Sequence, residues 1–333
     1  MVILKQYFFR IRVLLSLILF VAVLNSFGCA TINISPSLGD LEEVTIEGDG
    51  PGKILLIDFS GIINNQKNRN ITGNIISLGM VEKIRSILNK AEKDKEIQAL
   101  LIKMNSPGGT VTASDIIFHL LNEYKENNKV KVYVQVMDLA ASGGYYVALA
   151  GDEIIAHPTS LVGSIGVIAL KVNLKDLMTK IGVDWEIVKS GDKKDFMSPF
   201  RSFTKEERDL FQDTIDKYHQ RFITTITQNR PKLKTTQVEL LADGRGFDSE
   251  QAKKLNLIDD IGYVTDTIER IKLDLNDLNL KLVTYHRSNK YQGNIYSQFQ
   301  KPTSFNIINV DLGLNPNSLS PVSYTHLTLP TKA

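Results

Sequence analysis

Apolar runs alternate with segments of helical periodicity between residues 53 and 156, and few folds accommodate such an order. Four runs have the length and continuity of strands buried on both faces of a sheet, namely 53–59, 99–104, 131–136 and 153–156. Apolar residues between the runs recur at helical spacing, in 81–91 and in 116–124. Strands that alternate with helices are typical of an α/β fold with a parallel sheet and crossover helices.

The folded domain is predicted to extend over residues 53–288. Thr204 and Glu207 form a capping box that opens a long helix, and Asp248 can cap a further helix. Residues 31–52 lack periodicity and are interpreted as a linker. Residues 289–333 are rich in Asn, Ser, Gln, Pro and Thr, so we expect little packed structure there. The end of this tail, 322–333, resembles translated sequencing-adapter read-through and is left out of the functional reasoning.

The first thirty residues have the pattern of a targeting segment. Lys5, Arg10 and Arg12 precede the uncharged stretch Val13–Leu24, which predicts a secretory signal or membrane anchor over 1–30. Cys29 follows small residues and resembles a bacterial lipoprotein cleavage site, so it is a candidate for lipidation. A lipoprotein, an uncleaved anchor and free secretion remain open. The first two would hold the rest of the chain at a membrane, outside the cytoplasm.

Charge and metal-ligand composition exclude several classes of function. Lys and Arg number 39 against 37 Asp and Glu, so no basic field suggests a nucleic-acid partner. Cys29 is the only cysteine, which rules out an internal disulfide and a cysteine-based zinc site. The five histidines show no paired metal-ligand spacing. We therefore expect neither a metal nor a cofactor.

Three glycine-containing turns, 105–109, 141–146 and 162–167, carry the candidate chemistry. Ligands of open α/β sheets bind beyond the carboxyl ends of the strands, so we expect these turns to meet in one crevice. Backbone N–H groups of a Gly-Gly pair can approach a substrate and hold a developing oxyanion. Ser142 is then a candidate nucleophile. Each turn by itself also fits ordinary turn chemistry.

A nucleophilic serine requires a base. His157 is the nearest histidine, but it stands where a predicted strand ends. The alternative is a lysine from the cluster Lys189, Lys193 and Lys194. About 0.04% of an ordinary lysine is neutral at pH 7, so a lysine base needs burial to lower its pKa. The residues alone do not choose among these lysines, and the cluster also fits a solvated basic loop.

The ordered set of motifs resembles signal peptide peptidase A, a family of bacterial Ser-Lys membrane peptidases. The resemblance extends from about residue 53 to residue 267. It rests on the segments 105–109, 142–146, 158–167, 194–201, 244–245 and 251–259.

This resemblance implies a fold of the Clp protease/crotonase type with repeated ββα units, and it assigns roles to residues. The implied roles are nucleophile for Ser142, general base for Lys194, orientation of that lysine for Ser164, and an oxyanion hole for Gly109 and Gly143, with Gly108 as an alternative donor.

The resemblance further implies the short, single-core type of the family. Such members form a dome-shaped homo-octamer in which serine and lysine come from neighbouring protomers. The implied function is a serine endopeptidase on the extracytoplasmic side of the bacterial membrane, which degrades cleaved signal peptides and other apolar peptides. Three alternatives remain: a crotonase-like acyl-CoA enzyme, a Clp-type protease with His157 as base, and a catalytically silent oligomeric scaffold at the membrane.

Overall fold

The computed structural model describes residues 39–69, 75–287, 294–296 and 323–325. The chain divides into two units, Met1–Ser37 and Leu38–Ala333, and every described residue belongs to the second. The predicted signal or anchor segment and Cys29 lie outside the described residues. In the described part of the chain, no helix is both long and apolar enough to cross a membrane.

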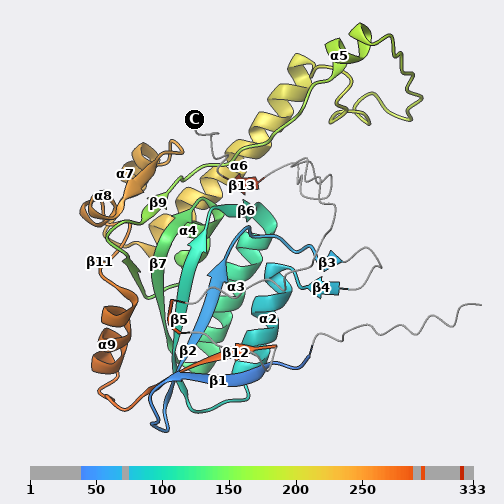
Figure 1. Ribbon diagram of the computed structural model, residues 1–333. Coiled ribbons are helices and arrows are strands. Elements are labelled where there is room, and N and C mark those ends of the chain that lie inside the picture. Colours follow the sequence, from blue (N-terminus) through green and yellow to red (C-terminus); the bar gives the residue numbers. More distant parts are fainter. Residues whose placement is uncertain (1–38, 70–74, 288–293, 297–322, 326–333) are drawn as a thin grey trace, which may run out of the picture. The chain divides into compact units, whose positions relative to one another are not determined.

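A nine-stranded sheet forms the centre of the described unit (Figure 1). Its main path has the order β1-β12-β2-β5-β7-β8-β11, and β9 and β10 extend from β7. The pairs from β12 to β11 along this path are parallel, and β1 is antiparallel to β12. The strands are β1 Glu42–Glu47, β2 Lys53–Ser60, β5 Ile97–Ser106, β7 Lys131–Ala141, β8 Glu153–Ala156, β9 Leu161–Gly163, β10 Gly246–Asp248, β11 Asp260–Ile261 and β12 Lys281–His286.

The four apolar runs predicted as strands are confirmed as β2, β5, β7 and β8. They occupy the middle of the sheet, where Leu55 of β2 pairs with Leu100 of β5, and Leu100 pairs with Val132 of β7. All three side chains are fully buried. Continuous apolar sequence is expected at such positions because both faces of the strands are covered.

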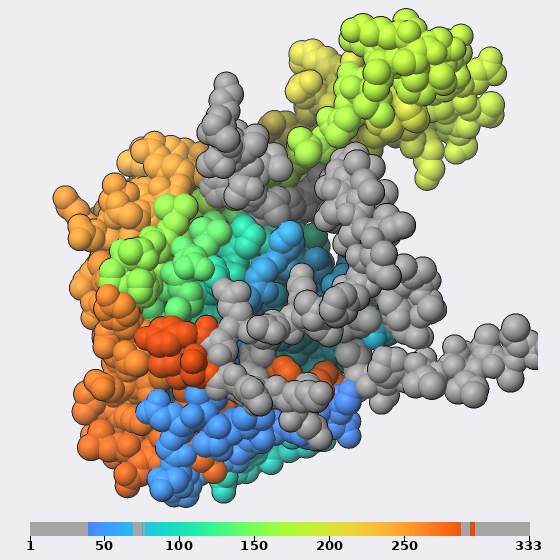
Figure 2. Space-filling view, viewed as in Figure 1, coloured from blue at the N-terminus to red at the C-terminus, as the bar shows by residue number. Residues whose placement is uncertain are grey.

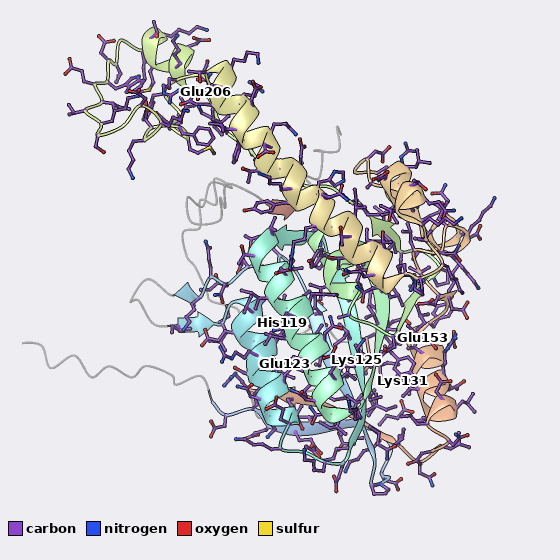
Figure 3. All side chains as sticks on the ribbon, turned by 180° about the vertical axis from the view of Figure 1, so that it is seen from behind. His119, Glu123, Lys125, Lys131, Glu153 and Glu206 are labelled. Atoms are coloured by element: carbon purple, nitrogen blue, oxygen red, sulfur yellow. The ribbon has the colours of Figure 1, made fainter. Side chains whose placement is uncertain are left out.

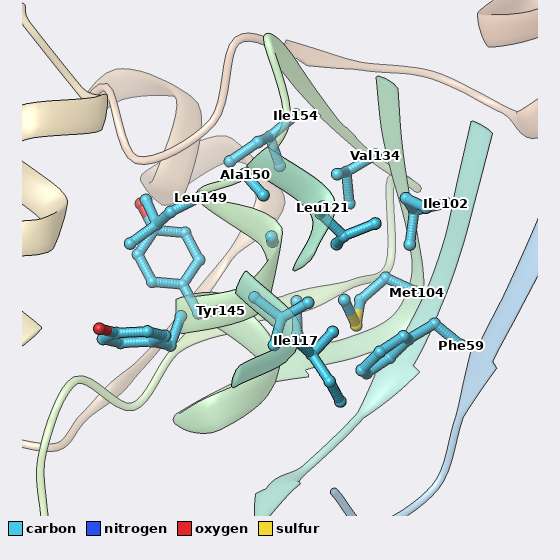
Figure 4. Packing of buried hydrophobic residues seen from close by; sticks show 14 of the residues in the cluster. Phe59, Ile102, Met104, Ile117, Leu121, Val134, Tyr145, Leu149, Ala150 and Ile154 are labelled. Carbon is cyan, nitrogen blue, oxygen red and sulfur yellow. The ribbon is translucent and has the colours of Figure 1, made fainter. Parts of the chain in front are cut away.

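Helices cover both faces of this sheet. On one face lie α2 (Met80–Ala91), α3 (Val111–Asn128) and α4 (Gly143–Ala148), and on the other lies α9 (Val264–Asp274). Figure 4 shows the larger core, in which side chains of α3 and α4 pack on the strands. Ile117 of α3 and Tyr145 of α4 belong to the same buried cluster as Ile102 and Met104 of β5. Both strands β5 and β7 and the helices that follow them, α3 and α4, are thus packed in one core. This packing holds the turns between strand and helix in place.

The remaining helices among the described residues are α5 Lys175–Lys180, α6 Lys205–Asn229, α7 Thr235–Leu241 and α8 Ser249–Lys254. The predicted capping box at the start of α6 is confirmed: the Thr204 side chain accepts the Glu207 N–H, and the Glu207 carboxylate accepts the Thr204 N–H. The Asp248 side chain caps α8 as predicted, by accepting the Gln251 N–H.

Two short strands lie in the segments predicted to be a linker and a tail with little packed structure. β1 falls within the predicted linker, and its half-buried residues Val44 and Ile46 lie along the sheet edge formed by β12. Within the predicted tail, β13 (Ser323–Thr325) pairs antiparallel with β6 (Gly108–Thr110). A further two-stranded pair joins β3 (Asn68–Arg69) to β4 (Ile75–Ser77).

Residues 167–218 form an arm that stands clear of the sheet (Figures 1 and 2). It comprises α5, the loop that follows and the outer part of α6. None of the α5 side chains is buried, and the first buried apolar residue of α6 is Phe222, beyond the arm. The arm leaves many apolar side chains exposed, including Leu170, Val172, Leu177, Ile181, Val188 and Leu210.

Candidate active site

The predicted nucleophile Ser142 lies in a sharp turn between β7 and α4. Its backbone has φ +55° and ψ −120°, a conformation that residues other than glycine rarely adopt. The Ser142 N–H donates to the Gly163 carbonyl (2.7 Å), and its carbonyl accepts the Tyr146 N–H (2.9 Å). These bonds fix both sides of the turn, and they hold Ser142 at the carboxyl end of β7 with only 2% of the residue exposed.

Two glycines bring a second backbone segment against this turn. A Cβ on Gly143 would lie 2.4 Å from Ser114 Oγ and 3.1 Å from the Gly109 nitrogen. A Cβ on Gly109 would lie 1.9 Å from the Ile63 carbonyl oxygen, so neither position has room for a side chain. The Gly109 amide therefore lies beside the turn that carries Ser142. The Gly143 N–H is the first of α4, where an N–H has no acceptor within the helix.

Gly108 differs from Gly109 in how its amide is used. Its N–H donates to Ser106 Oγ (3.1 Å), and Ser106 Oγ donates in turn to the Gly61 carbonyl (2.7 Å). The Gly108 carbonyl accepts the Ile63 N–H (2.8 Å). Because this amide already has an acceptor, the geometry favours Gly109 over Gly108 as a donor toward Ser142.

Ser164 lies next to the nucleophile turn because two parallel strands end there together. Ala141 of β7 pairs with Gly163 of β9, so Ser142 and Ser164 follow paired residues. Ser164 also has a positive φ, +50°, and its N–H donates to the Arg245 carbonyl (2.9 Å). The structure thus brings Ser142, Ser164 and the two glycine amides to one end of the sheet.

Lys194 is placed elsewhere. It lies on the arm, in the turn that follows α5, and its side chain is exposed. Figure 1 shows this part of the arm beside the outer end of α6, away from α4. Within one chain, the hydrogen bonds and ion pairs of the described residues do not join Lys194 to Ser142.

Two sequence models of protein families match this chain: peptidase family S49 at residues 124–279 and Clp protease at residues 59–162. A protein of Enterococcus faecium, provisionally named signal peptide peptidase SppA, is 31% identical over 244 residues. The match covers 73% of this chain and 70% of that relative. The chain belongs to peptidase family S49.

Other S49 similarities are shorter. A protein of Methanocaldococcus jannaschii, provisionally named a protease, is 35% identical over 200 residues, which cover 60% of this chain and 63% of the relative. This chain therefore spans just under two thirds of that relative. A solved mutant of ClpP1 from Listeria monocytogenes has a TM-score of 0.41 at 17% identity, and the match covers 63% of this chain and 92% of that chain. The predicted signal peptide peptidase A family and Clp-type α/β fold are confirmed by the family matches.

The three clustered lysines of this S49 chain, Lys189, Lys193 and Lys194, differ in the ion pairs that they form. Lys189 Nζ donates to Asp195 Oδ1 (2.9 Å) and to the Asp192 carbonyl (2.7 Å). Lys193 Nζ pairs with the Glu206 carboxylate. Lys194 forms no ion pair with any residue that the structure describes. The amines of Lys189 and Lys193 are thus engaged by carboxylates, so among the three lysines Lys194 is the one whose amine has no carboxylate partner in the described part of the chain.

His157 makes contacts that lead away from Ser142. Its N–H donates to the Val136 carbonyl, and its Nδ1 lies 2.9 Å from Thr159 Oγ1. The imidazole meets the Tyr263 ring edge-on, with 4.9 Å between ring centroids. A base in a serine protease instead needs hydrogen-bond reach of the nucleophile, so the structure gives the Clp-type alternative with His157 no support.

Sequence reasoning did not assign roles to the residues that hold the site from behind. The Ile63 carbonyl accepts the Thr110 N–H and closes against Gly109. Ser114 Oγ donates to the Thr110 carbonyl while it lies against Gly143. Among the residues that support the site, only Gly244-Arg245 had been noted in the sequence, as one of the motifs of the family resemblance. The Arg245 carbonyl accepts the Ser164 N–H.

Proposed function

We propose that this S49 chain is a serine endopeptidase whose active site combines Ser142 of one protomer with Lys194 of another. The observation that carries the proposal is the buried Ser142 turn, where the amide of Gly109 and the first amide of α4 lie next to Ser142. A strained, enclosed serine beside converging N–H groups is the arrangement that acyl transfer needs.

In the acylation step, the neutral Lys194 amine takes the proton of Ser142 Oγ. The alkoxide attacks the carbonyl carbon of the scissile peptide bond. The N–H groups of Gly109 and Gly143 stabilise the oxyanion that develops. The lysine ammonium then donates its proton to the leaving nitrogen, which releases the amine product and leaves an ester on Ser142.

In the deacylation step, the neutral lysine activates a water molecule, which attacks the ester and releases the acid product. Ser164, beside the nucleophile, would accept a lysine N–H and so orient the amine. A lysine acts as a base at neutral pH only when it is withdrawn from water. Lys194 is exposed in a single chain, so contact with a second protomer would supply the burial that its role requires.

The β6 strand supports peptides in extended conformation as the substrate class. Its residues include Gly109, and it forms an antiparallel pair with Ser323–Thr325. Ser323–Thr325 belongs to the suspected read-through and has no functional meaning of its own, but its pairing places an extended backbone on the β6 edge, directly beside the candidate oxyanion donor. A substrate strand added at this edge would present its carbonyl groups to the site. Cleaved signal peptides and other apolar peptides are the substrates that we infer.

The arm supports assembly. Its exposed apolar residues, such as Leu170 and Val172, are typical of a surface that a partner covers. We infer a homo-oligomer, an octamer by family resemblance, held at the extracytoplasmic side of a bacterial membrane by residues 1–30.

The test is hydrolysis of an apolar fluorogenic peptide by the full chain. Wild type, Ser142→Ala, Lys194→Ala and an equal mixture of the two variants are compared. Lys180→Ala is the matched control, because Lys180 is another exposed lysine of the arm. We expect activity in wild type and control, at most a small residual rate in the single variants, and recovery in the mixture. Random mixing leaves about one quarter of the sites with both residues.

Each other outcome identifies a different error. Activity in Ser142→Ala would contradict the nucleophile and direct attention to the acyl-CoA alternative, for which binding of a CoA thioester is the next measurement. Activity in Lys194→Ala would contradict the base. An inactive wild type in its assembled form would favour the silent scaffold. Absence of recovery in assemblies that contain both variants in the same oligomer would contradict the division of the site between protomers.

A further inference from the structure

Two carboxylates are shielded from solvent within the otherwise exposed arm. Glu207 is 2% exposed, and the Asp195 side chain is 9% exposed. Charged side chains are seldom so enclosed unless they are paired. Asp195 directly follows Lys194 in the chain, so whatever fixes Asp195 also fixes the backbone that carries the proposed base.

Arg201 joins the two carboxylates. Its Nε and Nη2 donate to the two oxygens of Asp195, at 2.7 and 3.0 Å. Its Nη1 and Nη2 donate to the two oxygens of Glu207, at 2.8 and 2.5 Å. A planar guanidinium has the fork of donors to bind two carboxylates in this way, and a lysine ammonium does not.

Each end of this bridge is attached to further structure. The Glu207 carboxylate also accepts the Thr204 N–H (2.9 Å), within the capping box that starts α6. Asp195 also accepts from Lys189 Nζ (2.9 Å). The Arg201 carbonyl accepts from Lys171 Nζ (2.8 Å). One guanidinium thus connects the loop that bears the base to the first turn of a 25-residue helix.

A second, exposed contact lies on the other side of Lys194. Lys193 pairs with Glu206, which Figure 3 shows on the outer part of α6. The residues before and after Lys194 are therefore both tied to the start of this helix. The lysine between them projects without an ion pair to the described part of the chain.

We propose that Arg201 is a positioning residue for Lys194: by bridging Asp195 and Glu207, it fixes the base to α6 before the arm meets a second protomer. The inference rests on the proposed function, because it assigns Arg201 a role through the catalytic lysine. A base held in place beforehand loses little conformational entropy when the site assembles.

The bridge stays charged across the pH range in which a peptidase works. Arg201 and then Lys189 hold the pKa of Asp195 far below its ordinary value. Pairing with Arg201, followed by the Thr204 N–H, lowers the pKa of Glu207 to about 2. At both groups the hydrogen-bonded ion pairs lower the pKa by more than burial raises it. Acid therefore does not release the bridge at any pH where the lysine is expected to work.

The experiment compares Arg201→Gln, Arg201→Lys and Glu207→Gln in the full, assembled chain. We expect Arg201→Gln to lower kcat/KM about 100-fold, mainly through kcat, since small misplacements of a catalytic group have effects of this size. Arg201→Lys keeps the positive charge but lacks the planar set of donors that binds two carboxylates. Glu207→Gln keeps an oxygen that can accept the Thr204 N–H but lacks the negative charge. Both should give intermediate losses. Lys217→Gln, which removes an exposed pair with Asp213 on the same helix, should match wild type.

Two readouts separate positioning from a purely structural role. The acidic limb of the pH profile of kcat/KM should move to higher pH in Arg201→Gln, because a loosely held lysine is less often withdrawn from water. On a Lys194→Ala background, Arg201→Gln should lower the residual rate no further. The inference would be overturned if Arg201→Gln left the acidic limb of the pH profile in place. It would also be overturned if Arg201→Gln lowered the rate as much on the Lys194→Ala background as it does in wild type. If Lys194→Ala itself keeps full activity, the failure belongs to the proposed function instead.

Should Arg201→Gln fail to assemble, Arg201→Lys and Glu207→Gln carry the same comparisons. Wild-type kinetics in both assembled variants would overturn the inference. A shifted acidic limb in either would support it.

Discussion

Ser142 and Ser164 are two of five non-glycine residues with positive φ in the described part of the chain. The other three, Lys129, Asn256 and Asn276, lie at or just past helix ends, where a left-handed residue commonly ends the helix. No helix ends at the two serines. Their strained backbone is instead kept by the strands and hydrogen bonds around them, as is frequent at functional sites.

This strain predicts an unusual order of stability among Ser142 variants. Such a backbone conformation costs a residue other than glycine on the order of 1–3 kcal/mol, and glycine avoids this strain. Glycine also loses more conformational entropy on folding than alanine, which offsets about 0.5–1 kcal/mol of that gain. We expect Ser142→Gly to be about 1 kcal/mol more stable than Ser142→Ala in urea denaturation. Both variants lack the hydroxyl, so the comparison isolates the backbone.

The matched control is Ser86, which lies within helix α2 and donates to the Glu82 carbonyl. There the order should reverse, because glycine is about 1 kcal/mol worse than alanine inside a helix. If Ser142→Gly were no more stable than Ser142→Ala, the positive φ at this position would cost nothing.

Single residues also show how far sequence reasoning reaches. The turn that carries Ser142 was predictable because its glycines and its place after a buried strand are local features. The residues alone left Lys189, Lys193 and Lys194 open, and the family resemblance assigned the base to Lys194. The pairing of Lys193 with Glu206, 13 positions away in sequence, was not predictable. The spacing of the residues does not reveal which lysine a carboxylate engages.

At the scale of elements, the central strands and capped helices followed from patterns that their own residues carry. β1 did not, because Val44 and Ile46 are its only apolar residues and it pairs with β12 at the far end of the domain. The arm escaped prediction for a different reason. Its apolar residues, such as Leu177 and Ile181, have no core to face within the described unit, so their pattern indicated no fold.

The first turn of α6 predicts a specific acid sensitivity. Glu207 has its pKa lowered from 4.5 to about 2, mainly by Arg201. A carboxyl group whose pKa is lower in the folded than in the unfolded chain stabilises the fold at pH values above its unfolded pKa, here about 4.5. This stabilisation is lost as the pH falls from about 4.5 through the folded pKa of about 2. Thermal melts of wild type and Glu207→Gln should therefore differ at pH 6 and converge toward pH 2.

Glu206→Gln serves as the comparison in these melts. The Glu206 carboxylate is 69% exposed and its pair with Lys193 should contribute little. A gap between wild type and Glu207→Gln that persists unchanged to pH 2 would contradict the ion pairing at the start of α6.

For the whole molecule, a site shared between protomers predicts that activity depends on protein concentration. Specific activity should fall on dilution as the assembly dissociates, because the arm that carries Lys194 extends away from α4, which begins just after Ser142 (Figure 1). Sedimentation velocity over the same concentrations would supply the fraction assembled. Constant specific activity in samples that sediment as single chains would place the complete site within one protomer.

If substrates bind at the β6 edge as we propose, this mode of binding has a consequence for which peptides the enzyme can cleave. A strand edge binds the amide groups of its ligand, so the order of side chains in the peptide matters less than its conformation. A helix already satisfies those amide groups internally, above all in lipid. A peptide left as a helix in a bilayer would have to unwind before it could be cut. Unwinding would then limit the rate of its degradation. Peptides with proline or N-methylated residues at the paired positions would resist degradation whatever their hydrophobicity.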